Sequence, residues 1–392
     1  MTATIIITLS ILILIAYAFD LSSKHTRLPT VILLLVLGWG MKQLAVFFKV
    51  GLPELQPLLP ILGTVGLILI VLEGGLDLEL NHSKRNVLNR SAISALLPII
   101  VLQLALGYAF SYFSGTSFVN GMVNALPLCI ISSAIAIPSV RYLSDKNREF
   151  VIYESSFSDI FGVILFNFFI ENETVSLGAV GHFILQALIM LLISMAASML
   201  LAWLIKKVDH HVKFIPIIMM VILIYTVSKL YHLPSLIFIL IFGLFLNNLD
   251  ELKHLSFIKK LEPEKLESEV QRFREIVTEI TFLVRTMFFL LLGFTIDARA
   301  LLNIRDICIA TALVAGFMLL RYIQLRLAKM ELSPLLFIFP RGLITILLFL
   351  SIPVAHSIPF VNASLMVLVV LISTIVMMMG LLFQKKALPV VA

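Results

Sequence analysis

Charged residues are scarce in this sequence. They make up only 13% of its 392 residues, whereas ordinary soluble domains are roughly 25% charged. Hydrophobic residues make up 60%, and the mean hydropathy is +1.08. Because no polar block is long enough to fold alone, the composition excludes a water-soluble globule and predicts one integral membrane domain over residues 1–392.

Cysteine is rarer still, with two residues in the chain. Cys129 and Cys308 both lie in apolar runs, and no CxxC spacing exists, which argues against a disulfide framework and against a structural metal centre. The eight His residues are scattered, mostly in polar connections. We therefore expect no cofactor and no transition-metal site.

Long apolar runs are what the sequence has in abundance. A helix needs about 20 apolar residues to cross the bilayer core, and division at Pro, Gly and charge clusters yields thirteen such runs. We therefore predict an all-α polytopic membrane protein. The predicted spans are 3–19, 28–47, 55–76, 91–111, 119–140, 150–170, 178–205, 214–231, 233–249, 277–296, 303–326, 333–351 and 361–383.

The basic residues predict the orientation of these spans. With the N-terminus outside, 21 of the 29 Lys and Arg residues fall in cytoplasmic connections and five in outer ones, as the positive-inside rule requires. This placement explains the net charge of +6 without a nucleic-acid partner. The C-terminus would be cytoplasmic, and the location expected is a bacterial inner membrane.

The longest polar stretch, 250–276, mixes apolar residues with Lys and Glu. This pattern predicts a cytoplasmic amphipathic linker helix on the inner membrane surface. The chain stops about nine residues after the last predicted span, so we expect no soluble C-terminal regulatory domain.

Two predicted spans are unusually interrupted. Span 5 holds two prolines and the pair Ser132-Ser133, and span 12 holds Pro334, Pro340 and Gly342. Broken helices at corresponding positions of two halves are typical of secondary transporters. Because the two spans are seven apart and cross in opposite directions, we predict two inverted six-helix repeats, spans 1–6 and 8–13.

Two charged residues, Asp159 and Arg341, lie deep within these spans. A charge in the bilayer core costs at least about 2.5–3.5 kcal/mol. Asp159 lies about 14 Å into span 6 and Arg341 about 12 Å into span 12, at the depth of Ser132 and Ser133. On the helix of span 6, positions four apart share a face, which groups Ser155 with Asp159 and Glu154 with Ser158.

This spacing predicts two roles. Asp159 with neighbouring hydroxyls offers hard oxygen ligands for a small cation, and Glu154 would pair with Arg341 as a structural ion pair. The other reading is that Asp159 only bridges to Arg341 for packing.

Other charges in the spans are less distinctive. Glu73, in a ValLeuGluGlyGly stretch, is interpreted as functional. Arg285 has two readings: it either serves the ion site or extends its side chain to the headgroups. Arg321 is interpreted as structural.

These motifs resemble the monovalent cation:proton antiporter superfamily, closest to its NhaP-like sodium/proton exchanger branch. The resemblance covers nearly the whole chain and rests on the EGGL, ESSFSD, FFLLLGFTID and PRGL stretches that begin at Glu73, Glu154, Phe288 and Pro340. It implies that Asp159 binds the cation or the proton, assisted by Ser155 and Glu73, and that Glu154 pairs with Arg341. It also implies a homodimer with a role in pH homeostasis.

The chain departs from the family pattern at two places. The family has an Asn-Asp or Asp-Asp pair where this chain has Ser158-Asp159. It also has a Thr-Asp-Pro motif where this chain has Ser132-Ser133-Ala134. Ser132, Ser133 and Ser158 therefore join the candidate ion site, while the choice among Na+, Li+ and K+ stays open.

The predicted function is antiport of a monovalent cation, first of all Na+, against H+, with both competing for Asp159. An intramembrane aspartyl protease would need a second Asp at this depth, so no enzyme activity is expected. A cation channel or membrane sensor on the same fold, or the membrane subunit of a potassium efflux system, remains the alternative.

Overall fold

A computed structural model describes most of the chain. It covers residues 2–26, 30–48, 57–78, 85–140, 143–172, 177–207, 213–231, 233, 235–251, 263–295 and 301–382. Every regular element within these ranges is helical, so the predicted all-α class is confirmed. In chain order the elements are α1 (Thr2–Thr26), α2 (Thr30–Phe47), α3 (Leu58–Asp77), α4 (Arg85–Ser114), α5 (Phe118–Cys129), α6 (Ser133–Ser139), α7 (Asp145–Glu171), α8 (Leu177–Lys207), α9 (Phe214–Leu230), α10 (Ser235–Asn247), α12 (Pro263–Thr295), α14 (Ile304–Leu327), η2 (Leu335–Phe337), α15 (Leu343–Leu350), η3 (Val354–His356) and α16 (Ala363–Leu382).

Each of the thirteen predicted spans coincides with a helix or, for spans 5 and 12, with a pair of shorter helical pieces. Eight of the described segments are long and apolar enough to cross a bilayer by length and composition. α9 and α10 are apolar but shorter, and α7 carries charges at both ends and near its middle.

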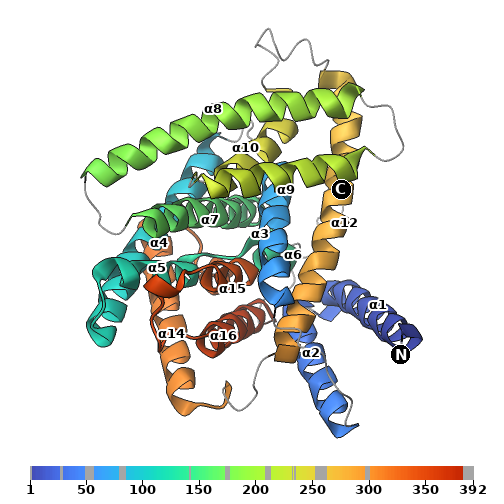
Figure 1. The fold of residues 1–392 in the computed structure, drawn as a ribbon. Coiled ribbons are helices and arrows are strands. Elements are labelled where there is room, and N and C mark those ends of the chain that lie inside the picture. Colours follow the sequence, from blue (N-terminus) through green and yellow to red (C-terminus); the bar gives the residue numbers. More distant parts are fainter. Residues whose placement is uncertain are drawn as a thin grey trace.

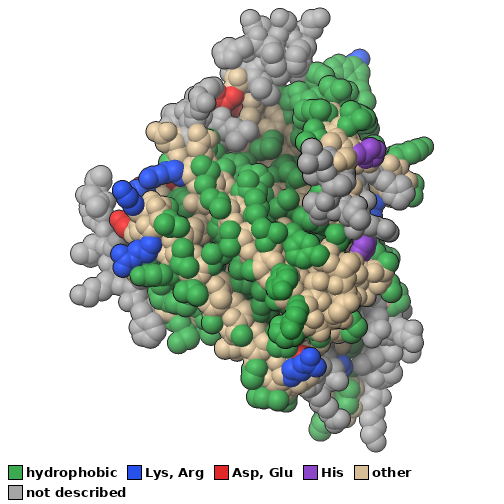
Figure 2. All heavy atoms as spheres, turned by 90° about the vertical axis from the view of Figure 1, so that its left-hand side faces the viewer, with side chains coloured by type: hydrophobic (Ala, Val, Ile, Leu, Met, Phe, Trp, Pro, Cys, Tyr) green, Lys and Arg blue, Asp and Glu red, His purple; other side chains and the backbone are tan. Residues whose placement is uncertain are grey.

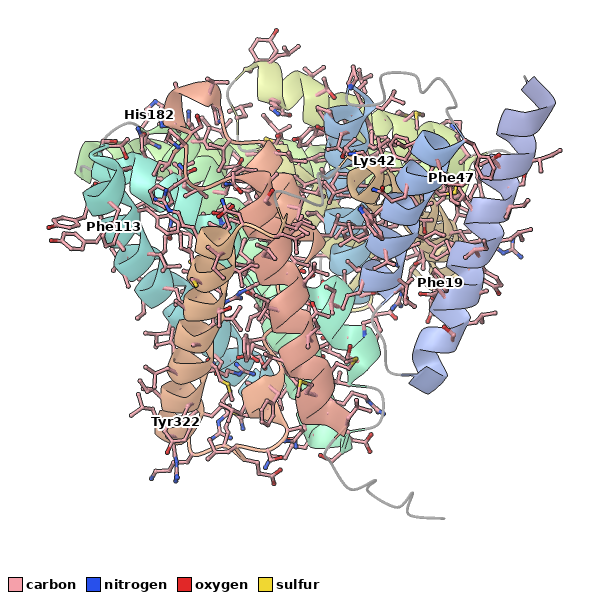
Figure 3. The ribbon with its side chains drawn as sticks, turned by 90° about the horizontal axis from the view of Figure 1, so that it is seen from below. Phe19, Lys42, Phe47, Phe113, His182 and Tyr322 are labelled. Atoms are coloured by element: carbon pink, nitrogen blue, oxygen red, sulfur yellow. The ribbon has the colours of Figure 1, made fainter. Side chains whose placement is uncertain are left out.

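The bundle surface suits a lipid environment. Hydrophobic side chains are spread across the described part of the face in Figure 2, and Lys and Arg lie near its margins. Aromatic side chains at helix ends point away from the bundle, as Figure 3 shows for Phe113 at the end of α4, where the residue is 77% exposed. α1 lies at the periphery, next to α2 and α12 (Figure 1).

The amphipathic segment expected over 250–276 differs from its prediction. Residues 252–262 lie outside the described residues, and from Pro263 onward the segment is the first part of α12, a continuous helix of 33 residues. At 1.5 Å per residue this helix is about 50 Å long, more than a bilayer core requires. Its apolar stripe is present, but Phe273 is fully buried against Phe214 of α9 and Phe242 of α10. The stripe therefore packs on protein instead of lying on the membrane surface.

Candidate functional site at the crossing of two interrupted helices

The first interruption separates α5 from α6. Ile130 and Ser132 have extended backbone, with φ and ψ of −86° and 129° and of −77° and 117°. Backbone N–H groups released from a helix must find partners, because bilayer lipid offers none. The N–H of Ile131 donates to Ser158 Oγ at 2.8 Å, and the N–H of Ser132 donates to the Pro340 carbonyl at 2.9 Å.

The second interruption separates η2 from α15. Pro340 lacks an N–H and so cannot continue the hydrogen-bond ladder of a helix. The following N–H groups are again satisfied by side chains: that of Arg341 donates to Ser373 Oγ at 3.0 Å, and that of Gly342 donates to Thr345 Oγ1 at 3.3 Å. The predicted break in span 12 is thus confirmed, as is the break in span 5.

The two interruptions cross in contact with each other. The bond from Ser132 to Pro340 joins them directly. A Cβ atom at Gly342 would lie 2.4 Å from Ser132 Oγ and 2.7 Å from Ser132 Cβ. Only glycine at this position allows the two backbones to approach this closely.

Asp159 reaches the crossing from α7. Its Oδ2 accepts hydrogen bonds from the backbone N–H of Ser133, at 3.2 Å, and from the Ser133 hydroxyl. Its Oδ1 is buried and has no hydrogen-bond partner among the described residues. The carboxylate is therefore held by one oxygen while the other stays available.

A small cavity lies beside this carboxylate. Its polar lining consists of Asp159, Ser133 and Ser156, and apolar side chains of α3, α7, α10 and α15 complete the wall. The space open to the centre of a water-sized sphere is about 20 Å³, which is room for a water molecule or a small ion. Oxygen atoms in an otherwise apolar wall suit a small hard cation.

The other serines of the predicted site lie elsewhere. Ser155 is buried, but its hydroxyl donates to the Val151 carbonyl at 2.8 Å and it does not line the cavity. Ser158 accepts from Ile131 and faces a second cavity on the other side of the crossing. Ser132 is buried at the crossing, and its hydroxyl has no partner among the described residues. The structure thus brings Ser133, rather than the other three, to Asp159.

Glu73 lies on α3, one residue before Gly74, which lines the cavity. It is half-buried and faces α12, where Thr278 and Arg285 are its polar neighbours. The predicted residue Arg285 is near enough to Glu73 for their charges to interact, and Glu73 lies next to the cavity but outside its lining.

The predicted pairing of Glu154 with Arg341 is wrong. Glu154 pairs with Arg321 of α14: Nη2 of Arg321 donates to Oε2 at 2.7 Å, and Nη1 donates to Oε1. Both side chains are 2% exposed. Gln324 completes the network by donating to Glu154 Oε1 and to the Ser94 carbonyl of α4, each at 2.9 Å.

Arg341 contacts a backbone carbonyl and an aromatic ring, not a carboxylate. Its Nη1 donates to the Cys129 carbonyl, the last residue of α5, at 3.0 Å. Its guanidinium carbon lies 4.4 Å from the centre of the Phe317 ring, within the range of a cation–π contact. The positive charge therefore meets the partial negative charge at the C-terminus of α5, not a carboxylate.

Sequence reasoning missed Ser156 and Gln324, and it gave Arg321 a structural role without recognising Glu154 as its partner. Ser156 lies three residues before Asp159, so the same helical spacing that selected Ser155 applies to it. Arg321 and Glu154 each lie about five residues from the cytoplasmic ends of their predicted spans, so comparing depths would have paired them.

A helical membrane bundle in which two interrupted helices, at corresponding positions of two halves, cross at a buried carboxylate has the architecture of a secondary transporter. Residues 9–384 match the family described as sodium/hydrogen exchanger, transmembrane, and the chain belongs to this family.

Solved structures support the same fold. The chain is similar to the sodium proton antiporter MjNhaP1 from Methanocaldococcus jannaschii, whose structure at pH 8 matches with a TM-score of 0.70 at 16% identity over 97% of this chain and 98% of that one. An electron-microscopy structure of the same antiporter matches with a TM-score of 0.65 at 14% identity, over 97% and 95% of the two chains. No curated protein sequence matches this chain.

Proposed function

We propose that the protein is a secondary antiporter that exchanges a monovalent cation, first of all Na+, for H+, and that both ligands compete for Asp159. The observation that carries this proposal is the carboxylate itself: Ser133 holds Oδ2, and Oδ1 is free beside a small cavity. Membership of the exchanger family supports it.

The chemistry of the cavity suits such competition. Oδ1 of Asp159 and the hydroxyl oxygens of Ser133 and Ser156 are hard ligands for a small cation, and a proton on the same carboxylate would remove its charge. One carboxylate cannot hold both ligands at once. Binding of the cation would therefore expel the proton, and binding of the proton would expel the cation.

The buried charges around the crossing favour one-for-one exchange. Asp159 and Glu154 carry negative charge, and Arg321 and Arg341 carry positive charge. Because Glu154 forms an ion pair with Arg321, Asp159 is the buried carboxylate that can bind the transported ions. The core then has the same net charge with H+ or with Na+ bound, so we expect electroneutral exchange by alternating access.

We further propose that the protein is a homodimer in a bacterial inner membrane, with its N-terminus outside. The orientation rests on the 21 basic residues assigned to cytoplasmic connections, and the homodimer rests on the family resemblance. The apolar bundle surface supports the membrane location (Figure 2). Accessibility of single cysteines placed in the connections to an impermeant thiol reagent tests the orientation.

The decisive experiment uses purified protein in proteoliposomes with an acidic lumen and a pH-sensitive dye. Na+, Li+ and K+ are added outside in turn, and the dye reports proton exit. We expect cation-dependent dequenching, and accumulation of 22Na+ above its external concentration while the pH gradient lasts.

Two variants on one helix sharpen this experiment. Asp159→Asn should abolish the exchange. Asp145→Asn, the same substitution at a site whose side chain is 90% exposed, should leave it intact. Cation movement that only follows the cation's own electrochemical gradient would instead identify a channel. A response to K+ alone would favour a potassium efflux subunit. No cation flux at all would favour a membrane sensor.

A further inference from the structure

A second cavity lies on the other side of the crossing from Asp159, between α4 and α14. It is similar in size to the first, with about 20 Å³ open to the centre of a water-sized sphere. Its polar lining consists of Ser158, Arg321, Gln324 and Arg341. Two of these four residues are cationic and none is acidic.

Arg341 brings an unbalanced positive charge to this cavity. The side chain is 2% exposed, and its Nε has no hydrogen-bond partner among the described residues. Nη1 is satisfied by the Cys129 carbonyl, but a helix C-terminus offers only about half a negative charge. No described carboxylate forms an ion pair with Arg341. A buried cation in this condition calls for a counter-ion.

The neighbouring groups add to the positive potential. Arg321 is near enough to Arg341 for the two charges to interact. The Arg321 charge is offset by Glu154, whose two oxygens are both occupied by Arg321 and Gln324. Glu154 therefore has no capacity left to neutralise Arg341.

Ser158 supplies a neutral donor to the same space. Its oxygen accepts from the Ile131 N–H, and its own hydrogen has no acceptor among the described residues. The cavity thus presents N–H and O–H donors around a space of one-ion size, and no carboxylate is among its lining residues. A small anion satisfies both the donors and the unbalanced charge.

We propose that this cavity binds a small monovalent anion with the chemistry of chloride, held by the Arg341 guanidinium and the Ser158 hydroxyl. The ion neutralises the buried arginine behind the crossing. It occupies a space separate from the Asp159 cavity, so its binding is measurable without transport.

The test is the thermal unfolding of the purified wild-type protein in detergent, titrated with chloride against isethionate at constant ionic strength. Isethionate is an organic anion too large for the cavity. Because a ligand that binds only the folded state raises its stability, we expect the melting temperature to rise with chloride and to saturate. Bromide should have the same effect.

Variants at Ser158 distinguish a site from a general salt effect. Ser158→Asp places a fixed carboxylate beside Arg341 and should melt at the same temperature in chloride and in isethionate. Ser158→Ala removes the hydroxyl donor and should shift the chloride midpoint to about tenfold higher concentration. Ser158→Thr keeps the hydroxyl and should keep the dependence on chloride.

Either of two results overturns the proposal. One is a wild-type melting temperature that is equal in chloride and isethionate. The other is a Ser158→Ala variant whose melting temperature rises with chloride at the same midpoint concentration as in the wild type. This second result can be obtained even if Ser158→Asp does not fold.

Discussion

Ser133 donates two hydrogen bonds to the same oxygen of Asp159, one from its backbone N–H at 3.2 Å and one from its hydroxyl. The backbone donor is the first residue of α6, so it exists only because the helix is broken at this point. The interruption and the carboxylate thus form one unit: the break supplies the donors, and the carboxylate satisfies them. The second oxygen of Asp159 remains without a partner beside the cavity.

Removing the Ser133 hydroxyl tests this unit. Ser133→Ala keeps the backbone bond but loses the side-chain bond and one oxygen that can contact a cation. A hydrogen bond to a charged group contributes about 1.5–3 kcal/mol, so we expect the KM for Na+ in proteoliposomes to rise about tenfold or more. Ser133→Thr retains the hydroxyl and should stay near wild type. An unchanged KM in Ser133→Ala would separate this residue from the ion site.

Ser155 and Ser156 are adjacent but differ in their surroundings. Ser156 lines the cavity with Asp159, whereas the Ser155 hydroxyl is committed to the Val151 carbonyl. We expect Ser156→Ala to raise the KM for Na+ severalfold and Ser155→Ala to have the smaller effect. The opposite order in cation titrations of transport would restore Ser155, the residue expected from the family resemblance, as the ligand.

The ion pair between Glu154 and Arg321 should dominate local stability. Breaking a buried pair leaves an uncompensated charge and costs about 3–5 kcal/mol. We expect Glu154→Gln and Arg321→Gln each to lower the free energy of unfolding in detergent by about this amount. The double variant should lose less than the two single losses combined, because neither charge is then left alone.

The exposed residue Asp145 provides the control for this pair. Asp145→Asn lies on the same helix and should change stability little. Additive losses in the Glu154 and Arg321 double variant would show that the two residues do not act as a pair.

Gly342 limits how closely the two interrupted helices approach. In Gly342→Ala the new Cβ would overlap Ser132, so we expect the crossing to open and transport to fall to background, with a lower melting temperature. Gly40→Ala is the matched control, since a Cβ there meets nothing within 4 Å. Wild-type transport in Gly342→Ala would contradict the close contact of the two breaks.

The sequence predicted the helices well because membrane spans are governed by composition and length, which are local properties. The break in span 12 was predictable for a similar reason: Pro340 cannot donate a backbone hydrogen bond wherever it lies. In span 5 the two prolines lie inside α5 and α6, so they indicated an interrupted span but not the position of its break. Equal depth placed Ser132 and Ser133 near Asp159, but it did not show which of the two serines contacts the carboxylate.

The errors concern which side chains meet at or near one depth. Equal depth alone favours Arg321 as the partner of Glu154, but depth does not show how the helices face each other. Arg321 and Arg341 both lie within the spans, and which of them meets Glu154 depends on how α14 rotates against α7. In the same way, Ser155 and Ser156 are both near Asp159 along one helix. The choice between them depends on where α3 and α10 pack, and these contacts join residues far apart in the chain.

If a cation and a proton compete for the Asp159 carboxylate, binding of the cation must release the proton, and this release can be measured without transport. Na+ is added to purified protein in weakly buffered detergent solution, and the protons released per Na+ bound are measured with a pH dye and calorimetry. At a starting pH low enough for Asp159 to be protonated, we expect about one proton per bound cation in the wild type and in Asp145→Asn, and none in Asp159→Asn. Cation binding without proton release in the wild type, or unchanged release in Asp159→Asn, would contradict it.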